Sequence, residues 1–120
     1  MTNKPKYTIF KNTTYAINGL IDIIKTESSF KVELAFCVIL IPFLILVDID
    51  MTNKLLMFIS LMGVLIAETI NSAIERVVDL VTLEHHPLAG RAKDVGSTIV
   101  FLSIGVFLVI WGINLYKLIE

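Results

Sequence analysis

One apolar run that passes directly into a polar segment limits what this chain can fold into. No Gly or Pro separates the run, residues 55–67, from the polar segment, residues 68–79. We therefore expect one helix that leaves a membrane and carries polar residues out of it. At about 100° per residue, five polar side chains fall within a sector of about 100°: Glu68, Asn71, Ser72, Glu75 and Asp79.

Such a stripe has two interpretations. Ionisable groups at membrane depth usually serve a function, since they are costly to keep there. A stripe that only hydrogen-bonds neighbouring helices would look similar. Function is favoured, because the acidic residues of the stripe are not matched by equal numbers of basic residues on the same helix.

The composition excludes an ordinary soluble domain. The chain has 120 residues, of which 56% are hydrophobic, and its mean hydropathy is +0.83. This length allows one domain, residues 1–120. The N-terminus is polar and no cleavage site follows the first apolar run, so we expect no cleaved signal peptide. Cys37 lies inside an apolar run and is expected to act as a small apolar filler.

We expect four helices, three of which cross the membrane. Over residues 7–27 apolar side chains recur at helical spacing without a continuous run, which is typical of an amphipathic helix on a membrane surface. Transmembrane helices are predicted over residues 31–48, 54–81 and 91–118. Pro42 should kink the first of them without breaking it.

The ends of these helices carry recognisable signals. Residues 48–53 predict a polar turn, and residues 82–90 predict a loop in which Pro87 and Gly90 interrupt the helical pattern. Trp111 and Tyr116, near the end of the last span, are predicted to anchor it at the membrane interface.

Basic residues are distributed unevenly between the two sides of the membrane. One side would hold the surface helix and the second loop, and the positive-inside rule places that side in the cytoplasm, with the C-terminus outside. Its basic residues are Lys4, Lys6, Lys11, Lys25, Lys31, Arg76, Arg91 and Lys93, whereas Lys54 and Lys117 lie on the other side.

Depth along the helices predicts two polar layers at the cytoplasmic side. Glu68 and Ser97 should lie at headgroup depth, where a carboxylate could act as a base on a lipid hydroxyl. The aqueous layer should hold carboxylates suited to a hard cation and a lysine suited to phosphate; its members are Glu27, Glu75, Asp79, Lys93 and Asp94. The pattern favours phosphoryl transfer from a Mg-nucleotide to a membrane alcohol, although the soluble nucleotide motifs are absent.

At these residues the chain resembles the small integral-membrane prokaryotic diacylglycerol kinases. The main matching blocks are residues 68–79, Glu84-x-His86 and residues 90–97, and weaker matches lie at Tyr15, Gly19, Leu20, Glu27, Phe30, Glu33, Asp48 and Asp50. The resemblance covers nearly the whole chain in order. It implies an all-α membrane protein, with an N-terminal amphipathic surface helix and three transmembrane helices, that assembles as a homotrimeric bundle with active sites shared between subunits.

The resemblance also implies an activity and roles for individual residues. The activity is ATP-dependent phosphorylation of diacylglycerol to phosphatidic acid, with Mg²⁺, at the cytoplasmic face of the bacterial inner membrane. Glu68 would be the general base, supported by Asn71, and Glu27 and Glu75 would be Mg²⁺ ligands. The ATP-binding set would be Tyr15, Glu27, Glu75, Glu84, His86, Lys93 and Asp94, and the lipid-side set would be Glu68, Ser97 and Lys54.

The chain departs from the family pattern in its first helix. Thr8 stands where an Arg is common, and Ile17 where a Trp is common. Lys31 and Lys54 also replace Arg, which keeps the charge and loses bidentate geometry. Lys6 or Lys11 could supply the missing basic group.

Alternatives remain open from the sequence. A related branch phosphorylates undecaprenol, and the segment His85-His-Pro-Leu-Ala resembles it, whereas residues 90–97 resemble the diacylglycerol branch. A small non-catalytic assembly protein is a further possibility. An ion-conducting oligomer is disfavoured, because the spans are almost free of ionisable groups.

Adjacent His85 and His86 are more often solvated than metal-bound, and Asp79 could pair with Arg76 or Lys93 instead of binding metal.

Overall fold

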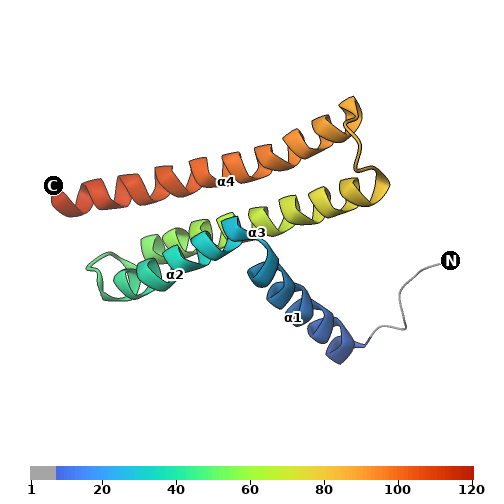
Figure 1. The fold of residues 1–120 in the computed structure, drawn as a ribbon. Helices are drawn as coiled ribbons and strands as arrows, with labels where there is room; N and C mark the ends of the chain where they lie inside the picture. Colours follow the sequence, from blue (N-terminus) through green and yellow to red (C-terminus); the bar gives the residue numbers. More distant parts are fainter. Residues whose placement is uncertain (1–7) are drawn as a thin grey trace.

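A computed structural model describes residues 8–120, which form four helices joined by short connections. The helices are α1 (Ile9–Thr26), α2 (Ser28–Leu46), α3 (Met51–Val81) and α4 (Pro87–Ile119). Helix α3 lies between α2 and α4 and runs antiparallel to both, and α1 leaves this bundle at an angle (Figure 1). The predicted all-α architecture is confirmed. Predictions for Lys4, Lys6 and Tyr7 lie outside the described residues.

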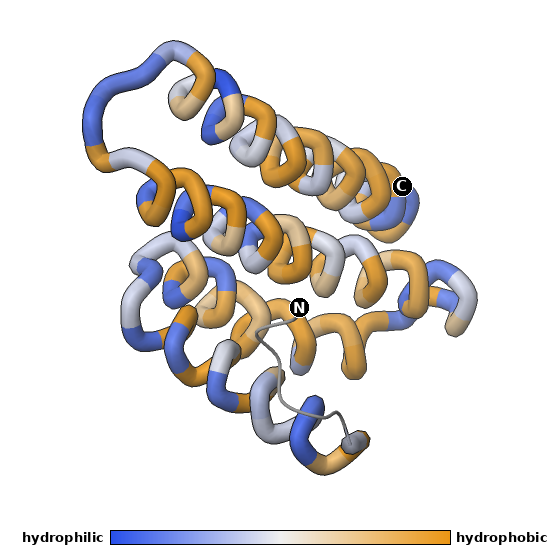
Figure 2. The backbone as a smooth tube through the Cα atoms, turned by 90° about the vertical axis from the view of Figure 1, so that its right-hand side faces the viewer, coloured by the Kyte–Doolittle hydropathy of each residue, from blue (hydrophilic) through white to orange (hydrophobic). Residues whose placement is uncertain are grey.

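Three of the four helices are long and apolar enough to cross a bilayer, namely α2, α3 and α4. At 1.5 Å per residue the 31 residues of α3 extend about 46 Å, more than the ~30 Å hydrocarbon core. Hydrophobic residues occupy most of the length of the bundle, and hydrophilic residues gather toward its ends and along α1 (Figure 2). Helix α3 is therefore longer than the hydrocarbon core is thick, and its length is compatible with the predicted extension of one end beyond the membrane.

The corner between α1 and α2 is a single residue. Glu27 adopts an extended backbone conformation, φ −107° and ψ 112°, which ends α1 and lets α2 begin at Ser28 in a new direction. The first span thus begins three residues before the predicted position 31. Pro42 lies inside α2, which continues to Leu46. At the other end of α1, the Thr8 side chain accepts a hydrogen bond from Lys11 N at 3.2 Å and caps the helix.

Caps explain why α3 and α4 begin earlier than the predicted residues 54 and 91. Asp50 Oδ2 accepts a hydrogen bond from Asn53 N at 3.2 Å, so α3 begins at Met51. His86 Nδ1 accepts from Leu88 N at 3.1 Å, so α4 begins at Pro87. Proline suits the first turn of a helix because its missing N–H would be unsatisfied there in any case.

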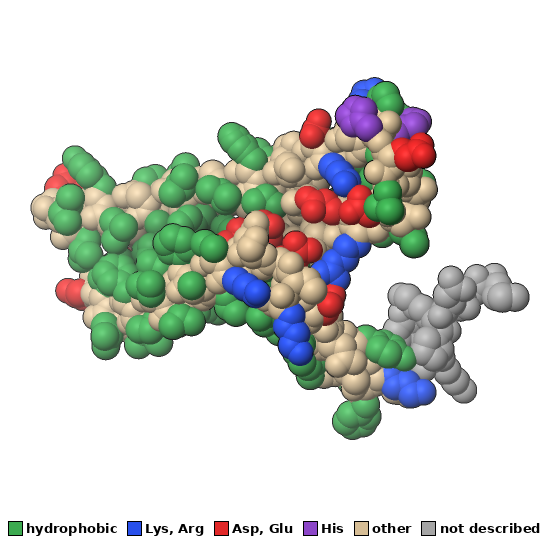
Figure 3. Space-filling view, viewed as in Figure 1, with side chains coloured by type: hydrophobic (Ala, Val, Ile, Leu, Met, Phe, Trp, Pro, Cys, Tyr) green, Lys and Arg blue, Asp and Glu red, His purple; other side chains and the backbone are tan. Residues whose placement is uncertain are grey.

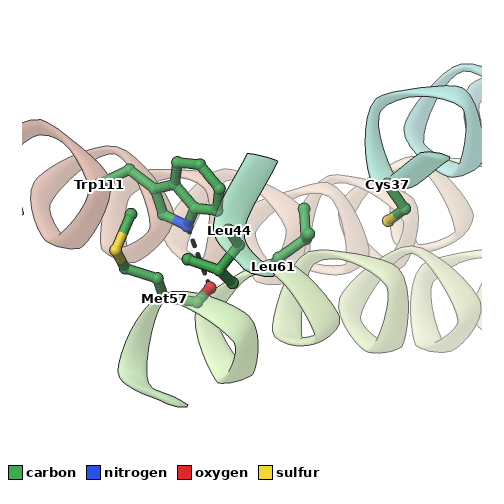
Figure 4. Packing of buried hydrophobic residues seen from close by; sticks show 5 residues of the cluster. All are labelled: Cys37, Leu44, Met57, Leu61 and Trp111. Carbon is green, nitrogen blue, oxygen red and sulfur yellow. Dashed lines mark hydrogen bonds between the residues drawn. The ribbon is translucent and has the colours of Figure 1, made fainter. Parts of the chain in front are cut away.

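The apolar core lies where α2, α3 and α4 meet. Cys37, Leu44, Met57, Leu61 and Trp111 form one buried cluster (Figure 4). The Trp111 side chain is only 5% exposed and its Nε1 donates to Met57 O at 3.0 Å. The prediction of Trp111 as an interfacial anchor is therefore wrong: the residue lies on the face of α4 that packs against α3, and a helix carbonyl satisfies its N–H.

Candidate active site

The polar stripe of α3 continues the side of the helix that faces the core. Met57, Leu61 and Val64 are buried on this side, and the same helical spacing leads to Asn71 and Ser72, which are 8% and 5% exposed. Glu68, between Val64 and Asn71, and Glu75, which follows Ser72, are partly buried on the same side. Most of the stripe therefore points toward the other helices rather than into open solvent, whereas Asp79, at its end, is exposed.

Helix α2 adds a carboxyl group to this stripe. Phe30, Cys37 and Leu44 form its buried seam at seven-residue spacing, and Glu33 lies on the same seam. The Glu33 carboxyl interacts with that of Glu68 across the contact between α2 and α3. Its Oε2 atom is buried and has no hydrogen-bond partner among residues 8–120. In the sequence, Glu33 is only a weak match to the family pattern. Its spacing of three residues from Phe30 and four from Cys37 was the signal for an inward orientation.

Four carboxyl groups converge in this region. Glu27 and Glu75 also lie close enough to Glu68 to interact with it electrostatically. Acidic side chains gather in the middle of the face shown in Figure 3, with basic side chains beside them, while hydrophobic side chains cover the surface toward the C-terminus. Because like charges repel, such a cluster favours a bound cation or a shared proton.

The corner between α1 and α2 rests on α3 through hydrogen bonds. Ser72 Oγ donates to Glu27 Oε1 at 2.8 Å. Arg76 Nη2 donates to Thr26 Oγ1 at 2.8 Å and to Glu27 Oε1 at 3.4 Å. Arg76 Nη1 donates to Asp22 Oδ2. These contacts could not be predicted from the sequence, because they depend on the direction in which α1 leaves α2.

Helix α4 meets the stripe at a glycine. A Cβ atom at Gly96 would lie 2.5 Å from Asn71 Oδ1, so only glycine allows this approach without displacement. Asn71 Oδ1 is buried and accepts no hydrogen bond from the described residues. One helical turn toward the loop, Lys93 Nζ donates to Asp79 Oδ1 at 2.7 Å. Of the two partners considered for Asp79, the structure selects Lys93.

A pocket of about 250 Å³ opens where α3 and α4 are joined. Five of its polar lining residues were considered from the sequence: Asp79, Glu84, His85, His86 and Lys93. The histidines and an acidic side chain gather at this end of the molecule (Figure 3). The pocket therefore combines a cation with imidazole and carboxylate groups beside the end of the stripe.

Other predicted site residues lie apart from this pocket within one chain. Tyr15 is 46% exposed on α1, which diverges from the α3–α4 hairpin (Figure 1). Asp94 and Ser97 are exposed on α4. Lys54 lies at the opposite end of α3, about 21 Å along the helix from Glu68, and its Nζ donates to Ile45 O at 3.0 Å. The structure thus does not bring Lys54 together with the acidic cluster.

The carboxyl groups suit a metal that arrives with a nucleotide. Among residues 8–120, no group of three or more His, Cys, Asp or Glu side chains is arranged to hold a metal ion by itself. Mg²⁺ at phosphoryl-transfer sites is commonly held by one or two carboxylates together with substrate phosphates and water. Glu27 and Glu75, both near Glu68, provide oxygen ligands of the appropriate chemistry.

Together these features define a small helical membrane protein with a carboxylate-rich polar centre at one end of its spans. The chain belongs to the prokaryotic diacylglycerol kinase family, because the model of that family, described as prokaryotic diacylglycerol kinase, matches residues 14–115. It is accordingly a lipid kinase, as the resemblance implied, and the alternative of a non-catalytic assembly protein is not supported.

Curated relatives agree with this assignment. The chain is 36% identical over 104 residues to the diacylglycerol kinase of Haemophilus influenzae, covering 87% of this chain and 88% of the relative. It is 38% identical over 103 residues to that of Pseudomonas aeruginosa, covering 86% and 84%. It is also 34% identical over 97 residues to the undecaprenol kinase of Bacillus subtilis, covering 79% of each chain.

Proposed function

We propose that this protein transfers the γ-phosphate of Mg-ATP to the hydroxyl of diacylglycerol, giving phosphatidic acid, at the cytoplasmic surface of the bacterial inner membrane. The observation that carries the proposal is the convergence of four carboxyl groups on the core-facing side of α3: Glu27, Glu33, Glu68 and Glu75. This arrangement supplies a base and cation ligands at the end of apolar helices, where a lipid hydroxyl would be presented.

Glu68 is the proposed general base. Its carboxylate accepts the proton of the diacylglycerol hydroxyl while that oxygen forms a bond to the γ-phosphorus and the bond from phosphorus to the leaving ADP oxygen breaks. Partial burial reduces the contact of the carboxylate with bulk water. Asn71, one turn along α3, orients the reacting groups, and Ser97 lies on the lipid side.

The proposed nucleotide groups lie closer to the connection between α3 and α4. Glu27 and Glu75 would hold Mg²⁺, which neutralises charge on the transferring phosphate when it is bound. Lys93 would contact the phosphates by charge. Its ion pair with Asp79 is partly exposed, so replacing the Asp79 carboxylate by a phosphate would cost little free energy. Glu84 and His86 line the pocket beside it. Asp94 and Tyr15 complete the proposed ATP-binding set.

We further propose a homotrimer in which neighbouring subunits share active sites. Two observations support it. Tyr15 is carried on α1, which diverges from the α3–α4 hairpin (Figure 1), whereas the pocket lies where α3 and α4 are joined. Helix α4 also exposes large apolar side chains, with Phe101 67% exposed and Leu102 64% exposed. The uneven distribution of basic residues supports a cytoplasmic N-terminus and an outer C-terminus.

Undecaprenol is the second candidate substrate, favoured by the similarity to the Bacillus subtilis undecaprenol kinase. Purified protein in vesicles, supplied with Mg-ATP labelled at the γ-phosphate and with either lipid, distinguishes the two. We expect faster labelling of diacylglycerol. Faster labelling of undecaprenol would change the substrate and keep the mechanism, and labelling of neither lipid would contradict the proposed function.

A further inference from the structure

Arg76 connects two helices that are distant in the sequence. Its guanidinium group lies on α3 and donates to three partners at the end of α1: Asp22, Thr26 and Glu27. Arginine can make such contacts together because its planar group presents several N–H donors in a fixed fork.

These contacts determine which oxygen of Glu27 stays available. The hydrogen bonds from Ser72 and Arg76 both go to Oε1. Within residues 8–120, Oε2 accepts no hydrogen bond. A carboxylate held by one oxygen, with the other free, is the usual arrangement of an oriented metal ligand, whose supporting partners fix its direction.

Helix α1 has few other contacts that could hold this corner. Ile23 is the one buried side chain of α1, and α1 is otherwise largely exposed. Lys25, in the last turn of the same helix, makes no hydrogen bond or ion pair to the other described residues. The direction of α1 therefore depends strongly on Arg76.

We propose that Arg76 is a positioning residue of the phosphoryl-transfer site, which fixes the corner between α1 and α2 on α3 and presents Oε2 of Glu27 to the metal of the metal–nucleotide substrate. The proposal rests on the proposed function, because it assigns Glu27 to the metal. Arg76 itself touches neither substrate nor metal in this role; it acts through Glu27.

Arg76→Gln tests the proposal, with Lys25→Gln as the control that removes one positive charge from the same corner. The apparent KM for Mg²⁺ at saturating ATP should rise about tenfold in Arg76→Gln, the lower end of the effect of losing a supporting partner, because the contact is partly exposed. The kcat at saturating Mg²⁺ should change much less. Arg76→Lys should recover part of the affinity, Asp22→Asn should weaken it in the same direction, and Lys25→Gln should behave as the wild type.

Two measurements are independent of turnover. The first is the affinity for Mn²⁺ in the presence of a non-hydrolysable ATP analogue, measured by electron paramagnetic resonance. The second is the distance between spin labels at Ile17→Cys on α1 and Val81→Cys on α3, in a Cys37→Ser background. Both label positions are exposed, by 51% and 80%. Arg76→Gln should lower the Mn²⁺ affinity and broaden the distance distribution.

The outcomes separate this proposal from the proposed function. Unchanged Mn²⁺ affinity in Arg76→Gln would overturn the positioning role, even if the distance distribution broadens. A wild-type protein that binds Mn²⁺ with the analogue and phosphorylates no lipid would contradict the proposed function. Loss of Mn²⁺ affinity in Arg76→Gln would still support the positioning role in that case.

Discussion

Replacing Gly96 by alanine tests whether the close approach of α4 to the polar stripe is essential. The new Cβ would lie 2.5 Å from Asn71 Oδ1, 3.5 Å from Asn71 Cγ and 3.6 Å from Ile74 Cδ1. An ordinary contact between carbon and oxygen is about 3.3 Å, so the Asn71 oxygen must move by roughly 0.8 Å.

The cost follows from where Asn71 lies. Asn71 is 8% exposed, so rotation of its carboxamide must displace neighbouring atoms. Overpacking of this kind costs about 1–3 kcal/mol, whereas replacing glycine by alanine inside a helix returns about 0.5–1 kcal/mol. The two effects together give a net destabilisation of about 0–2.5 kcal/mol, and we expect a value of about 1 kcal/mol. Since misplacement of a catalytic group by about 1 Å can cost a factor of about 100 in rate, activity should fall by roughly tenfold or more.

Gly112→Ala is the matched control, because it makes the same change on the same helix where no atom lies within 4 Å. Unfolding in detergent micelles and phosphorylation of diacylglycerol would be measured for both variants. Gly112→Ala should equal or exceed the wild type in stability. If Gly96→Ala matches Gly112→Ala in both stability and rate, the packing of Gly96 on Asn71 does not matter and the reasoning is refuted.

Two further substitutions test the core and a helix cap. Trp111→Phe removes the hydrogen bond to Met57 O from a buried position, and unfolding in detergent should show a loss of about 1–2 kcal/mol; an unchanged midpoint would favour the interfacial position of this residue. Two hydrogen bonds from Asn53, one from its side chain and one from its backbone N–H, lower the pKa of the Asp50 carboxyl below its ordinary value. The charged form of Asp50 therefore stabilises the fold above about pH 4, and this stabilisation is lost as the pH falls through the lowered pKa. Asp50→Asn keeps a side chain that can cap the helix, so this variant should lose less stability than the wild type between pH 6 and pH 3. Unfolding midpoints at the two pH values measure the difference, and identical pH profiles for the two proteins would contradict the prediction.

The helical period predicted the architecture and the orientation of the stripe. The spacing from Glu68 to Asp79 placed five polar groups on one side of a helix, and Asn71 and Ser72 are buried on that side. The antiparallel order of the spans likewise predicted that Lys93 could lie near Asp79, and the two form an ion pair. These features depend on period and chain order, which a sequence contains directly.

Features that depend on angles between helices were missed. The contacts of Arg76 with the end of α1 follow from the direction set by the extended backbone at Glu27, which periodicity does not encode. Trp111 was misassigned because its position near a helix end suggested an interface, while its helical face determined its burial. Asp50 and His86 were overlooked as caps, although a short polar side chain before Asn53 and a proline after His86 were visible signals.

The central claim is that Glu68 is the base of a lipid kinase. Glu68→Gln keeps the shape of the side chain and removes its ability to accept the proton. Wild type, Glu68→Gln and the control Asp48→Asn would be compared in vesicles by transfer of labelled γ-phosphate from Mg-ATP to diacylglycerol. We predict that Glu68→Gln lowers kcat by about 10²–10⁴-fold while its unfolding midpoint and its affinity for a non-hydrolysable ATP analogue stay near those of the wild type, and that Asp48→Asn keeps the wild-type rate. A Glu68→Gln protein that phosphorylates diacylglycerol at the wild-type rate would contradict the account.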